Sequence, residues 1–438
     1  MFSEKKRIII GLLLPLFLMG VIGLYALFGG GSGTQEDPWL IETAEQLKYL
    51  STNGYYRQVA DIDLGVSPWN EGKGWEPIGI TGAAFSGNYD GGGYRISNLY
   101  INSPNTSDVG LFGTCFGATL KNIVLENVDV TGRKWVGGLA GQFSGKLPWK
   151  DGNPYGNIYN CSVSGSVKAD SRAGGLVGYS KYIKMYWSHS DVDVEGFGAD
   201  EVIGGFAGYL GEGVLISNCY SRGTVCTDNH MSSGAFVGIV NPLEGVVRIE
   251  NCYAAVEMPS NVKGFLGYSS LPNEYEVINS YWNHDLKESR DNGLEKTTEE
   301  MTYPYKGNVY DGWDFDNIWQ HDIDYTVNDG YPYLRKDIDI ELSADKDNLV
   351  TMWNTELNNY PNPFNPETTI SLNLPKASEV ELAIYNIKGQ LIKKLINTHM
   401  EAGQHKIVWN GNDVSSGLYF YKLTTPEGSL INKMMLLK

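Results

Sequence analysis

Two aspartates on one short alternating stretch, Asp191 and Asp193, come nearest in this sequence to a catalytic pair. Residues two apart on a β-strand point to the same face, so these carboxylates could act as the acid and base of glycoside cleavage. Their alternation with Val192 and Val194 is also the ordinary pattern of a half-buried strand. We therefore predict a solvated outer face, with a carbohydrate-active enzyme as the alternative.

Other residues with chemical potential are scattered. The six histidines are His189, His230, His284, His321, His399 and His405. None begins the His-Glu-x-x-His motif of a metallopeptidase, and no Gly-x-Ser-x-Gly nucleophile elbow occurs. Asp322, Asp324 and Asp329 offer the oxygen ligands that calcium takes, although their spacing matches no known calcium loop. These three aspartates are a calcium candidate, and we expect no other metal and no cofactor.

Repeated units must position these residues. Six glycine blocks recur, with their last glycines at 113, 141, 178, 208, 238 and 267, which gives steps of 28, 37, 30, 30 and 29 residues. The longest step contains a segment rich in turn-forming residues, 146–156, which we expect to be one extended loop. A regular period of this size predicts stacked copies of one supersecondary unit. One apolar position is shared by all six blocks and predicts a buried column of Leu111, Leu139, Leu176, Phe206, Phe236 and Phe265.

A second motif lies between the blocks: an apolar residue, a spacer, Asn, and then a small or apolar residue. Its Asn positions are Asn98, Asn122, Asn160, Asn218, Asn251 and Asn279. Asn accepts the left-handed backbone conformation at low cost, so each copy predicts a corner. With many β-branched residues and no helical period, the sequence predicts an all-β fold. We expect a single-stranded β-solenoid (β-helix) with short capping helices, followed by a small C-terminal antiparallel β-sandwich.

The position after the corner Asn contains Cys161, Cys219 and Cys252, three of the five cysteines. The same position in other copies contains Leu99, Ile123 and Ser280, which favours a column of small inward side chains. Adjacent coils would place Cys219 and Cys252 about 4.8 Å apart, close to the short end of disulfide-compatible separations. A disulfide is therefore the alternative. The sequence has no Cys-x-x-Cys motif and no paired histidines, so we do not expect a zinc site.

Three tyrosines, Tyr220, Tyr253 and Tyr281, follow that small position. One step from an inward residue, they should point outward and form an aromatic ladder on successive coils. Such rings could stack on sugars or anchor a protein partner. Identical rings in register also stabilise a parallel stack by packing on one another, and the pattern favours this structural role.

The glycine repeats resemble the GLUG repeat family of bacterial surface proteins over roughly residues 34–335. The resemblance extends to an opening and a closing segment, Trp75-Glu76-Pro77-Ile78-Gly79 and Asn328-Asp329-Gly330-Tyr331-Pro332-Tyr333-Leu334. It implies the solenoid fold and a surface location, but no activity, since the family occurs beside many functions.

The two ends of the repeat region have the features of caps. Thr43 with Gln46, and Thr297 with Glu300, match the capping box that begins a helix. An aromatic stretch from Trp313 to Tyr333 is expected to pack over the last coil. Open solenoid ends expose core and strand edges, which makes such caps physically necessary.

The N-terminus combines basic residues with an apolar run from Ile8 to Phe28, which is typical of a secretory signal peptide. The run is long enough to span a bilayer, so a retained membrane anchor is the alternative. The chain has a net charge of −17 and no basic patch, which argues against nucleic acid as a partner.

The last 80 or so residues contain a proline-rich start, Tyr360-Pro361-Asn362-Pro363-Phe364-Asn365-Pro366, and short alternating strands. This segment closely resembles the C-terminal sorting domain of cargo carried by the type IX secretion system. The resemblance implies that the secretion machinery is a partner and that the protein reaches the outside or the outer-membrane surface of a Bacteroidetes-like bacterium.

The expected organisation is 1–33 signal peptide or membrane anchor with Gly-rich linker, 34–84 N-terminal cap and first strands, 85–282 solenoid coils, 283–335 C-terminal cap, 336–356 linker and 357–438 sorting domain. We predict a secreted or cell-surface, non-enzymatic protein that serves in adhesin-like binding or as a structural scaffold. An extracellular glycan or a cell-surface molecule would be its partner. The alternative is a β-helix carbohydrate-active enzyme, either a polysaccharide lyase or a glycosidase.

Overall fold

A computed structural model of the chain describes residues 28–145, 155–198, 201–227, 232–242, 246–259, 262–269, 275–286, 294–336, 357–374, 377–401, 403–425 and 428–438. The leader expected over 1–28, the loop over 146–156 and the linker over 336–356 lie almost wholly outside these ranges. The chain divides into two compact units, Met1–Ile338 and Asp339–Lys438. Among the described residues, no helix is both long and apolar enough to cross a membrane.

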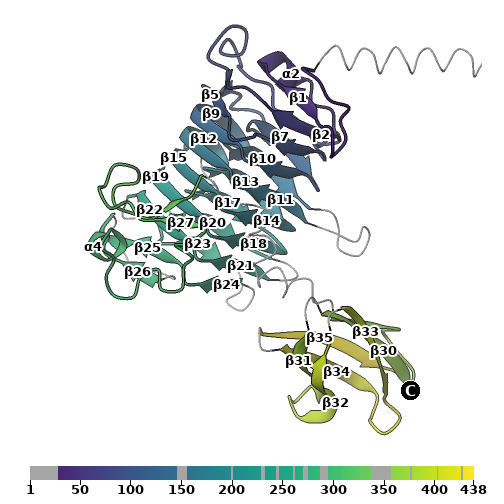
Figure 1. The fold of residues 1–438 in the computed structure, drawn as a ribbon. Helices are drawn as coiled ribbons and strands as arrows, with labels where there is room; N and C mark the ends of the chain where they lie inside the picture. Colours follow the sequence, from purple (N-terminus) through teal and green to yellow (C-terminus); the bar gives the residue numbers. More distant parts are fainter. Residues whose placement is uncertain are drawn as a thin grey trace, which may run out of the picture. The chain divides into compact units, whose positions relative to one another are not determined.

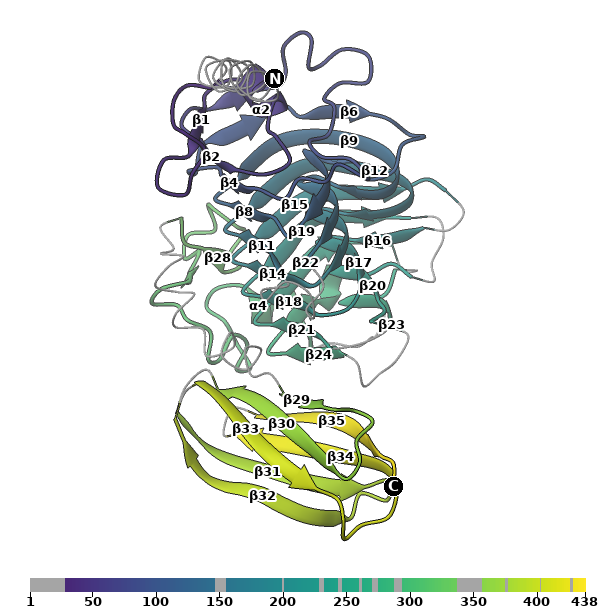
Figure 2. The same ribbon diagram turned by 90° about the vertical axis from the view of Figure 1, so that its right-hand side faces the viewer.

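The first unit is built from three parallel β-sheets, whose strands stack like steps from β1 to β24 (Figures 1 and 2). From β7 onward the turns add strands to all three sheets, and each new strand pairs in parallel with a strand of the turn before. For example, Ala140 of one turn pairs with Phe112 before it and Val177 after it. This pattern confirms the predicted all-β solenoid.

The first sheet has nine strands, and its bounds are β1 Trp39–Ile41, β2 Tyr55–Gln58, β4 Asn88–Asp90, β8 Thr119–Lys121, β11 Gly156–Tyr159, β14 Ile183–Tyr186, β18 Val214–Ser217, β21 Val247–Glu250 and β24 Tyr275–Ile278. The second has six strands, β7 Phe112–Phe116, β10 Ala140–Ser144, β13 Val177–Lys181, β17 Ala207–Leu210, β20 Val237–Val240 and β23 Leu266–Ser269. Each strand of the second sheet begins one residue before the last glycine of a glycine block.

The third sheet has eleven strands and contains the long strands that curve across Figure 2. Nine lie on one path, β3 Ile62–Asp63, β5 Arg95–Ser97, β9 Val124–Gly137, β12 Ser162–Gly174, β15 His189–Gly196, β19 Tyr220–Cys226, β22 Tyr253–Glu257, β25 Tyr281–Asn283 and β26 Leu294–Lys296. The other two, β6 Tyr100–Asn102 and β16 Val202–Gly204, pair with β9 and β12.

The residues of the predicted apolar column are all fully buried between the sheets. Phe236 stacks face to face on Phe206 and on Phe265, with ring centroids 4.7 and 4.8 Å apart. The neighbouring glycines allow the chain to pass closely over the outside of the six-stranded sheet. A Cβ on Gly178 would lie 2.4 Å from the backbone of Trp135, so a side chain there would displace the crossing segment.

The Asn corners are confirmed, since all six predicted Asn residues have φ between 45° and 59°. Asn98 belongs to a different corner from the other five, which corrects the expected alignment. Ser97 pairs with Glu126, so Asn98 lies beside Asn127, and Leu99 is not in the column of Ile123. The corner formed by the other five Asn residues is named the main corner. In the coil between those of Asn160 and Asn218, this corner is formed by Trp187, with φ 51°.

Short helices flank the repeats as expected. Helix α2 (Ala44–Lys48) begins with the Thr43 and Gln46 capping box, and α4 (Thr298–Met301) begins with the Thr297 and Glu300 box. A 3-10 turn, η1 (His284–Leu286), and a hairpin of β27 (Trp319–Gln320) and β28 (Tyr333–Leu334) complete the first unit.

The second unit has two antiparallel sheets around its own apolar core. One contains β29 Leu357–Tyr360, β30 Glu367–Leu374 and β33 Gly403–Asn410, and the other contains β31 Ser378–Asn386, β32 Leu391–Met400, β34 Gly417–Thr425 and β35 Gly428–Leu436. Trp409, Tyr421 and Phe364 are buried between them.

Candidate functional site: the outer face of the eleven-stranded sheet

The tyrosine ladder lies on the outer face of the eleven-stranded sheet, where Tyr220, Tyr253 and Tyr281 pair in register on β19, β22 and β25. The ring of Tyr220 stacks on that of Tyr253, with centroids 4.9 Å apart and planes 3° apart. His189 continues the stack on β15, with its ring 4.5 Å from Tyr220. Stacked in-register rings of this kind stabilise neighbouring coils.

The ladder does not form a free binding surface, because a segment from the aromatic stretch covers it. The exposed fractions of Tyr220, Tyr253 and Tyr281 are 5%, 0% and 5%. Trp319 lies 6.2 Å from Tyr220 and 6.1 Å from Tyr253 between ring centroids. Its indole N–H also donates to Asn218 Oδ1, at 3.1 Å. The expectation that these tyrosines are exposed is therefore wrong.

This covering segment, residues 303–335, is named the side cap here. It crosses several coils along the side of the stack, whereas the aromatic stretch was expected to close over the last coil. Trp313 donates its indole N–H to the carbonyl of Asn279, and Trp319 reaches Asn218, two coils away. Outward aromatic rings exposed over three coils would form a large apolar patch, and the side cap removes that patch from water.

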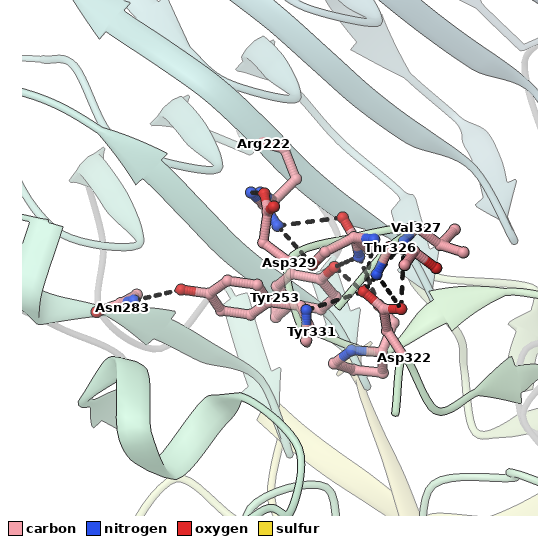
Figure 3. Close-up of polar contacts among 11 residues, drawn as sticks. Arg222, Tyr253, Asn283, Asp322, Thr326, Val327, Asp329 and Tyr331 are labelled. Carbon is pink, nitrogen blue, oxygen red and sulfur yellow. Dashed lines mark hydrogen bonds and ion pairs between the residues drawn. The ribbon is translucent and has the colours of Figure 1, made fainter. Parts of the chain in front are cut away.

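Arg222 is the main polar link between the sheet and the side cap (Figure 3). It lies on β19, two residues after Tyr220, and therefore on the same outer face. Its Nη1 donates to the carbonyl of Asn328 at 2.9 Å and to Asn328 Oδ1 at 3.1 Å, and its Nη2 pairs with Asp329 Oδ2 at 2.6 Å. The guanidinium also lies 4.6 Å from the centre of the Tyr331 ring.

Three further hydrogen bonds connect the next two coils to the same loop. The hydroxyl of Tyr253 donates to the carbonyl of Pro332 at 2.9 Å and accepts from Asn328 Nδ2 at 2.7 Å. Asn283, on β25, donates from Nδ2 to the hydroxyl of Tyr331. One short loop is thereby attached to three successive strands, β19, β22 and β25.

The calcium candidate is wrong in its geometry. Asp322 is buried, and its carboxylate accepts hydrogen bonds from the backbone N–H groups of Thr326, Val327, Asn328 and Gly330. Four N–H dipoles that point at one carboxylate repel a cation. Asp329 pairs with Arg222, and no group of three or more His, Cys, Asp or Glu residues able to hold a metal occurs in the described ranges.

The same N–H groups set the charge of Asp322. Burial acts to raise the pKa of this carboxyl, but the four backbone hydrogen bonds outweigh it and hold the pKa below its usual value. Asp322 is therefore a structural anion that fixes the loop contacted by Arg222.

The carboxylate pair, Asp191 and Asp193, is exposed on β15, next to the covered ladder. The strand register places Asp191 opposite Arg222 and Asp193 opposite Thr224. Asp193 accepts a hydrogen bond from the Thr224 hydroxyl at 2.8 Å. The two carboxylates thus share one face, as the alternation predicted.

The cysteines are free thiols. Cys161, Cys219 and Cys252 are buried in the column after the main corner, and each thiol donates to the carbonyl two residues before it. Burial raises the pKa of Cys161 to about 12, which keeps this thiol protonated. The alternative of a bridge between Cys219 and Cys252 is therefore wrong for this structure.

The sequence reading missed a second aromatic cluster, on the outside of the six-stranded sheet. Trp135 lies 4.7 Å from Tyr179 and 5.7 Å from Tyr209 between ring centroids. One signal was readable, since Tyr179 and Tyr209 each follow the last glycine of a repeat block. The bulge that brings Trp135 over them leaves no mark in the repeat pattern.

In the second unit, the proline-rich start is attached to the last strand of the domain. Asn362 Nδ2 donates to the carbonyl of Lys433, and the N–H of Met435 donates to Asn362 Oδ1. The N–H of Phe364 donates to the Met435 carbonyl. The proline-rich segment thus lies along β35, the C-terminal strand, and is attached to it by these hydrogen bonds.

The chain is similar in sequence to parts of known proteins. Halomucin of Haloquadratum walsbyi is 30% identical over 318 residues, which are 68% of this chain and 3% of that protein. An immunoglobulin A1 protease of Streptococcus sanguinis is 27% identical over 213 residues, 42% of this chain and 10% of that protein. The chain therefore spans only a small part of both relatives.

A solved structure from Bacteroides ovatus, described as a candidate immunoglobulin A1 protease, is similar in fold. It covers 71% of this chain and 96% of its own, with a TM-score of 0.53 and 20% identity. The family model for a secretion system C-terminal sorting domain matches residues 358–437. The chain is thus a secreted or cell-surface β-solenoid protein whose last 80 residues are a sorting domain of the type IX secretion system.

Proposed function

We propose that this protein is a non-enzymatic surface scaffold, in which the rigid solenoid presents a binding face to an extracellular partner. The observation that carries the proposal is the attachment of the side cap to β19, β22 and β25. Arg222, Tyr253 and Asn283 are polar side chains on the outer face, and all three form hydrogen bonds with the side cap. The polar chemistry of this face therefore stabilises the fold.

The stack itself suits a scaffold. Successive coils add parallel strands to the three sheets, and the buried column continues from Leu111 to Phe265. Continuous backbone ladders make such a stack stiff, and stability accumulates between neighbouring coils. A sorting domain that carries a stiff stack outside the cell would place its exposed faces where partners are available.

Adhesion and turnover assays test this proposal together. Cells that produce the full chain should bind glycan-coated or host-cell surfaces more strongly than cells that lack it. The purified chain should leave polysaccharides and immunoglobulin A1 uncleaved. Equal adhesion by both kinds of cell, or reducing-end or peptide release by the purified chain, would contradict the proposal.

An enzyme is the second candidate, favoured by the names of the Streptococcus sanguinis relative and the Bacteroides ovatus structure. If Asp191 and Asp193 are a catalytic pair, Asp191→Asn and Asp193→Asn should each abolish the release of reducing ends or of peptides. Asp129→Asn is the matched control, because Asp129 is exposed on the same outer face, in the column of Asp193. Equal activity in all three variants would remove this pair from consideration.

A further inference from the structure

Three aromatic rings meet on the outer side of the six-stranded sheet, on a surface distinct from the side cap. Tyr179 of β13 and Tyr209 of β17 are neighbours in register, and their rings stack with centroids 5.4 Å apart. Trp135, from the end of β9, packs against both rings. All three side chains remain partly exposed. Together with Lys134 and Arg172, these residues are named the Trp135 cluster.

Two cations lie against these rings. Lys134 Nζ is 4.6 Å from the centre of the Trp135 ring. The Arg172 guanidinium is 4.5 Å from Trp135 and 5.5 Å from Tyr209. Cation–π contacts hold both groups in place and leave their charges without a counter-ion.

No described residue forms an ion pair or a hydrogen bond with the side chain of Lys134 or Arg172. The Nε of Arg172 is buried without a hydrogen-bond partner. The nearby Arg133 differs, because it pairs with Asp170 at 4.0 Å. The Trp135 cluster therefore places two cations without an ion pair side by side, and one of them has a buried N–H without a partner, in a protein with a net charge of −17.

Two acidic groups act on the cluster, Asp108 on Lys134 and Glu212 on Tyr179, and neither forms an ion pair with Lys134 or Arg172 among the described residues. Asp108 accepts a hydrogen bond from the Thr81 hydroxyl at Oδ2, and burial raises the pKa of this carboxyl. The pKa of Lys134 is lowered by burial first and by the charge of Arg172 second. The positive charge of Arg172 thus acts on Lys134 more strongly than the charge of Asp108. An additional anion beside the two cations would reduce their mutual repulsion.

The backbone at Trp135 has an unusual conformation that aims the ring. Trp135 has φ 58°, and the pairing of β9 with β12 shifts by one residue there, since Arg172 pairs with Lys134 and Ala173 with Val136. A left-handed conformation costs a residue other than glycine about 1–2 kcal/mol. Such bulges re-aim a side chain, and here the result is an indole placed over two tyrosines between two cations.

We propose that the Trp135 cluster is a binding site for an acidic glycan, a chain of sugars that carries carboxylates. Aromatic faces stack on the apolar faces of sugar rings, and Tyr and Trp supply an apolar face together with a polar edge. Arg172 can bind a carboxylate through two parallel N–H groups, and Lys134 adds a second charge. The assignment rests on the binding role proposed above and names the class of its ligand.

Calorimetry with the purified full chain tests the assignment. The probes are tetragalacturonate, 3′-sialyllactose and a hyaluronan tetrasaccharide, with lactose and methyl-esterified tetragalacturonate as uncharged controls. At least one carboxylated probe should bind, and the uncharged controls should bind about tenfold more weakly or not at all. Trp135→Ala and Arg172→Gln should each weaken that binding by about tenfold.

Two variants control for surface and charge. Tyr49→Ala removes an aromatic ring that is 57% exposed elsewhere on the solenoid, and Arg133→Gln removes a neighbouring cation that is already paired. Both should bind within about twofold of the unmodified chain. Tyr209→Ser and Lys134→Gln serve as second variants if Trp135→Ala unfolds, which thermal melting would show.

Several results would overturn the assignment. These are a lack of binding by every carboxylated probe, equal binding of tetragalacturonate and its methyl ester, equal losses in Arg133→Gln and Arg172→Gln, or equally tight binding of a polyglutamate peptide. If the probes fail while producing cells still adhere, only this site is wrong. If adhesion does not depend on the protein, the proposed function itself fails.

Discussion

The guanidinium of Arg222 and the carboxylate of Asp329 are 107 residues apart in the chain and form an ion pair with 2.6 Å between Nη2 and Oδ2. Arg222 belongs to the sheet, and Asp329 belongs to the loop that covers it. The side chain of Arg222 is 17% exposed, while that of Asp329 is 77% exposed. The pair joins a rigid coil to a segment that has little regular structure of its own.

Arg222→Met should loosen the side cap while the coils stay intact. The change removes the ion pair and two hydrogen bonds to Asn328, and bonds to charged groups contribute about 1.5–3 kcal/mol each at most. We expect a local loss of about 2 kcal/mol, seen as faster hydrogen exchange at Trp319 and Tyr331. Arg133→Met is the control, since its exposed pair should contribute under about 1 kcal/mol. Equal exchange in both variants would contradict this role.

Asp322 should make the side cap sensitive to acid. Its folded-state pKa lies below the unfolded value of about 3.9. Its contribution to stability is therefore fully present above pH about 3.9 and is lost as the pH falls through the folded-state pKa. Proteolysis of the loop 322–330 by pepsin, followed between pH 5 and pH 2, should accelerate within that window. Asp322→Asn should be cut faster at pH 5 and show a flatter profile, and an unchanged profile would contradict the prediction.

Phe236 should be the most sensitive position of the buried column, because it stacks on a Phe on each side. Phe236→Ala should reduce the free energy of unfolding by about 3–5 kcal/mol. Phe236→Leu should cost about 1–2 kcal/mol, since Leu139 and Leu176 occupy the same position in earlier coils. Urea denaturation measures both, and similar losses for the two variants would show that the position does not select for volume.

Substitutions of Asn160 test why Asn occupies the corner, either for its left-handed backbone or for its side-chain hydrogen bond. It has φ 50°, and its Nδ2 donates to Asn122 Oδ1 at 2.9 Å. Asn160→Gly should lose only the hydrogen bond, about 1 kcal/mol. Asn160→Ala should lose about 1–2 kcal/mol more, because alanine is strained in the left-handed region. Equal midpoints in urea for the two variants would show that backbone strain is not what selects Asn.

The solenoid was predictable from sequence because its demands on residue type are local. A left-handed corner favours Asn, and a backbone crossing within 2.4 Å of a Cβ at position 178 favours Gly there, so both kinds of position recur through the sequence. The Trp187 corner was missed because its left-handed backbone is held by a fully buried indole, which breaks the motif. Asn98 was misaligned because two different corners of a coil use the same residue type.

The side cap and the Trp135 cluster could not be predicted in the same way. The contact of Arg222 with Asp329 depends on where an irregular loop returns, and no period in the sequence encodes that return. Outward tyrosines on three coils were readable, but whether water or another segment covers them is decided by tertiary packing. Likewise, the position of Trp135 depends on a one-residue shift between β9 and β12.

His189 gives a final test of the covered ladder, because its ring is stacked on Tyr220 beneath the same face. Burial lowers the pKa of His189 to about 4, below the unfolded value of about 6.5. Between these values the imidazole is protonated in the unfolded chain and neutral in the folded chain, so this contribution to stability is complete above pH about 6.5 and declines as the pH falls toward 4.

His189→Phe keeps a stacked ring and removes the titration, so its urea midpoint should vary less between pH 7 and pH 4.5. His399→Phe, at an exposed position of the sorting domain, is the control. A midpoint that falls equally in the unmodified chain and in His189→Phe would show that His189 does not cause this pH dependence.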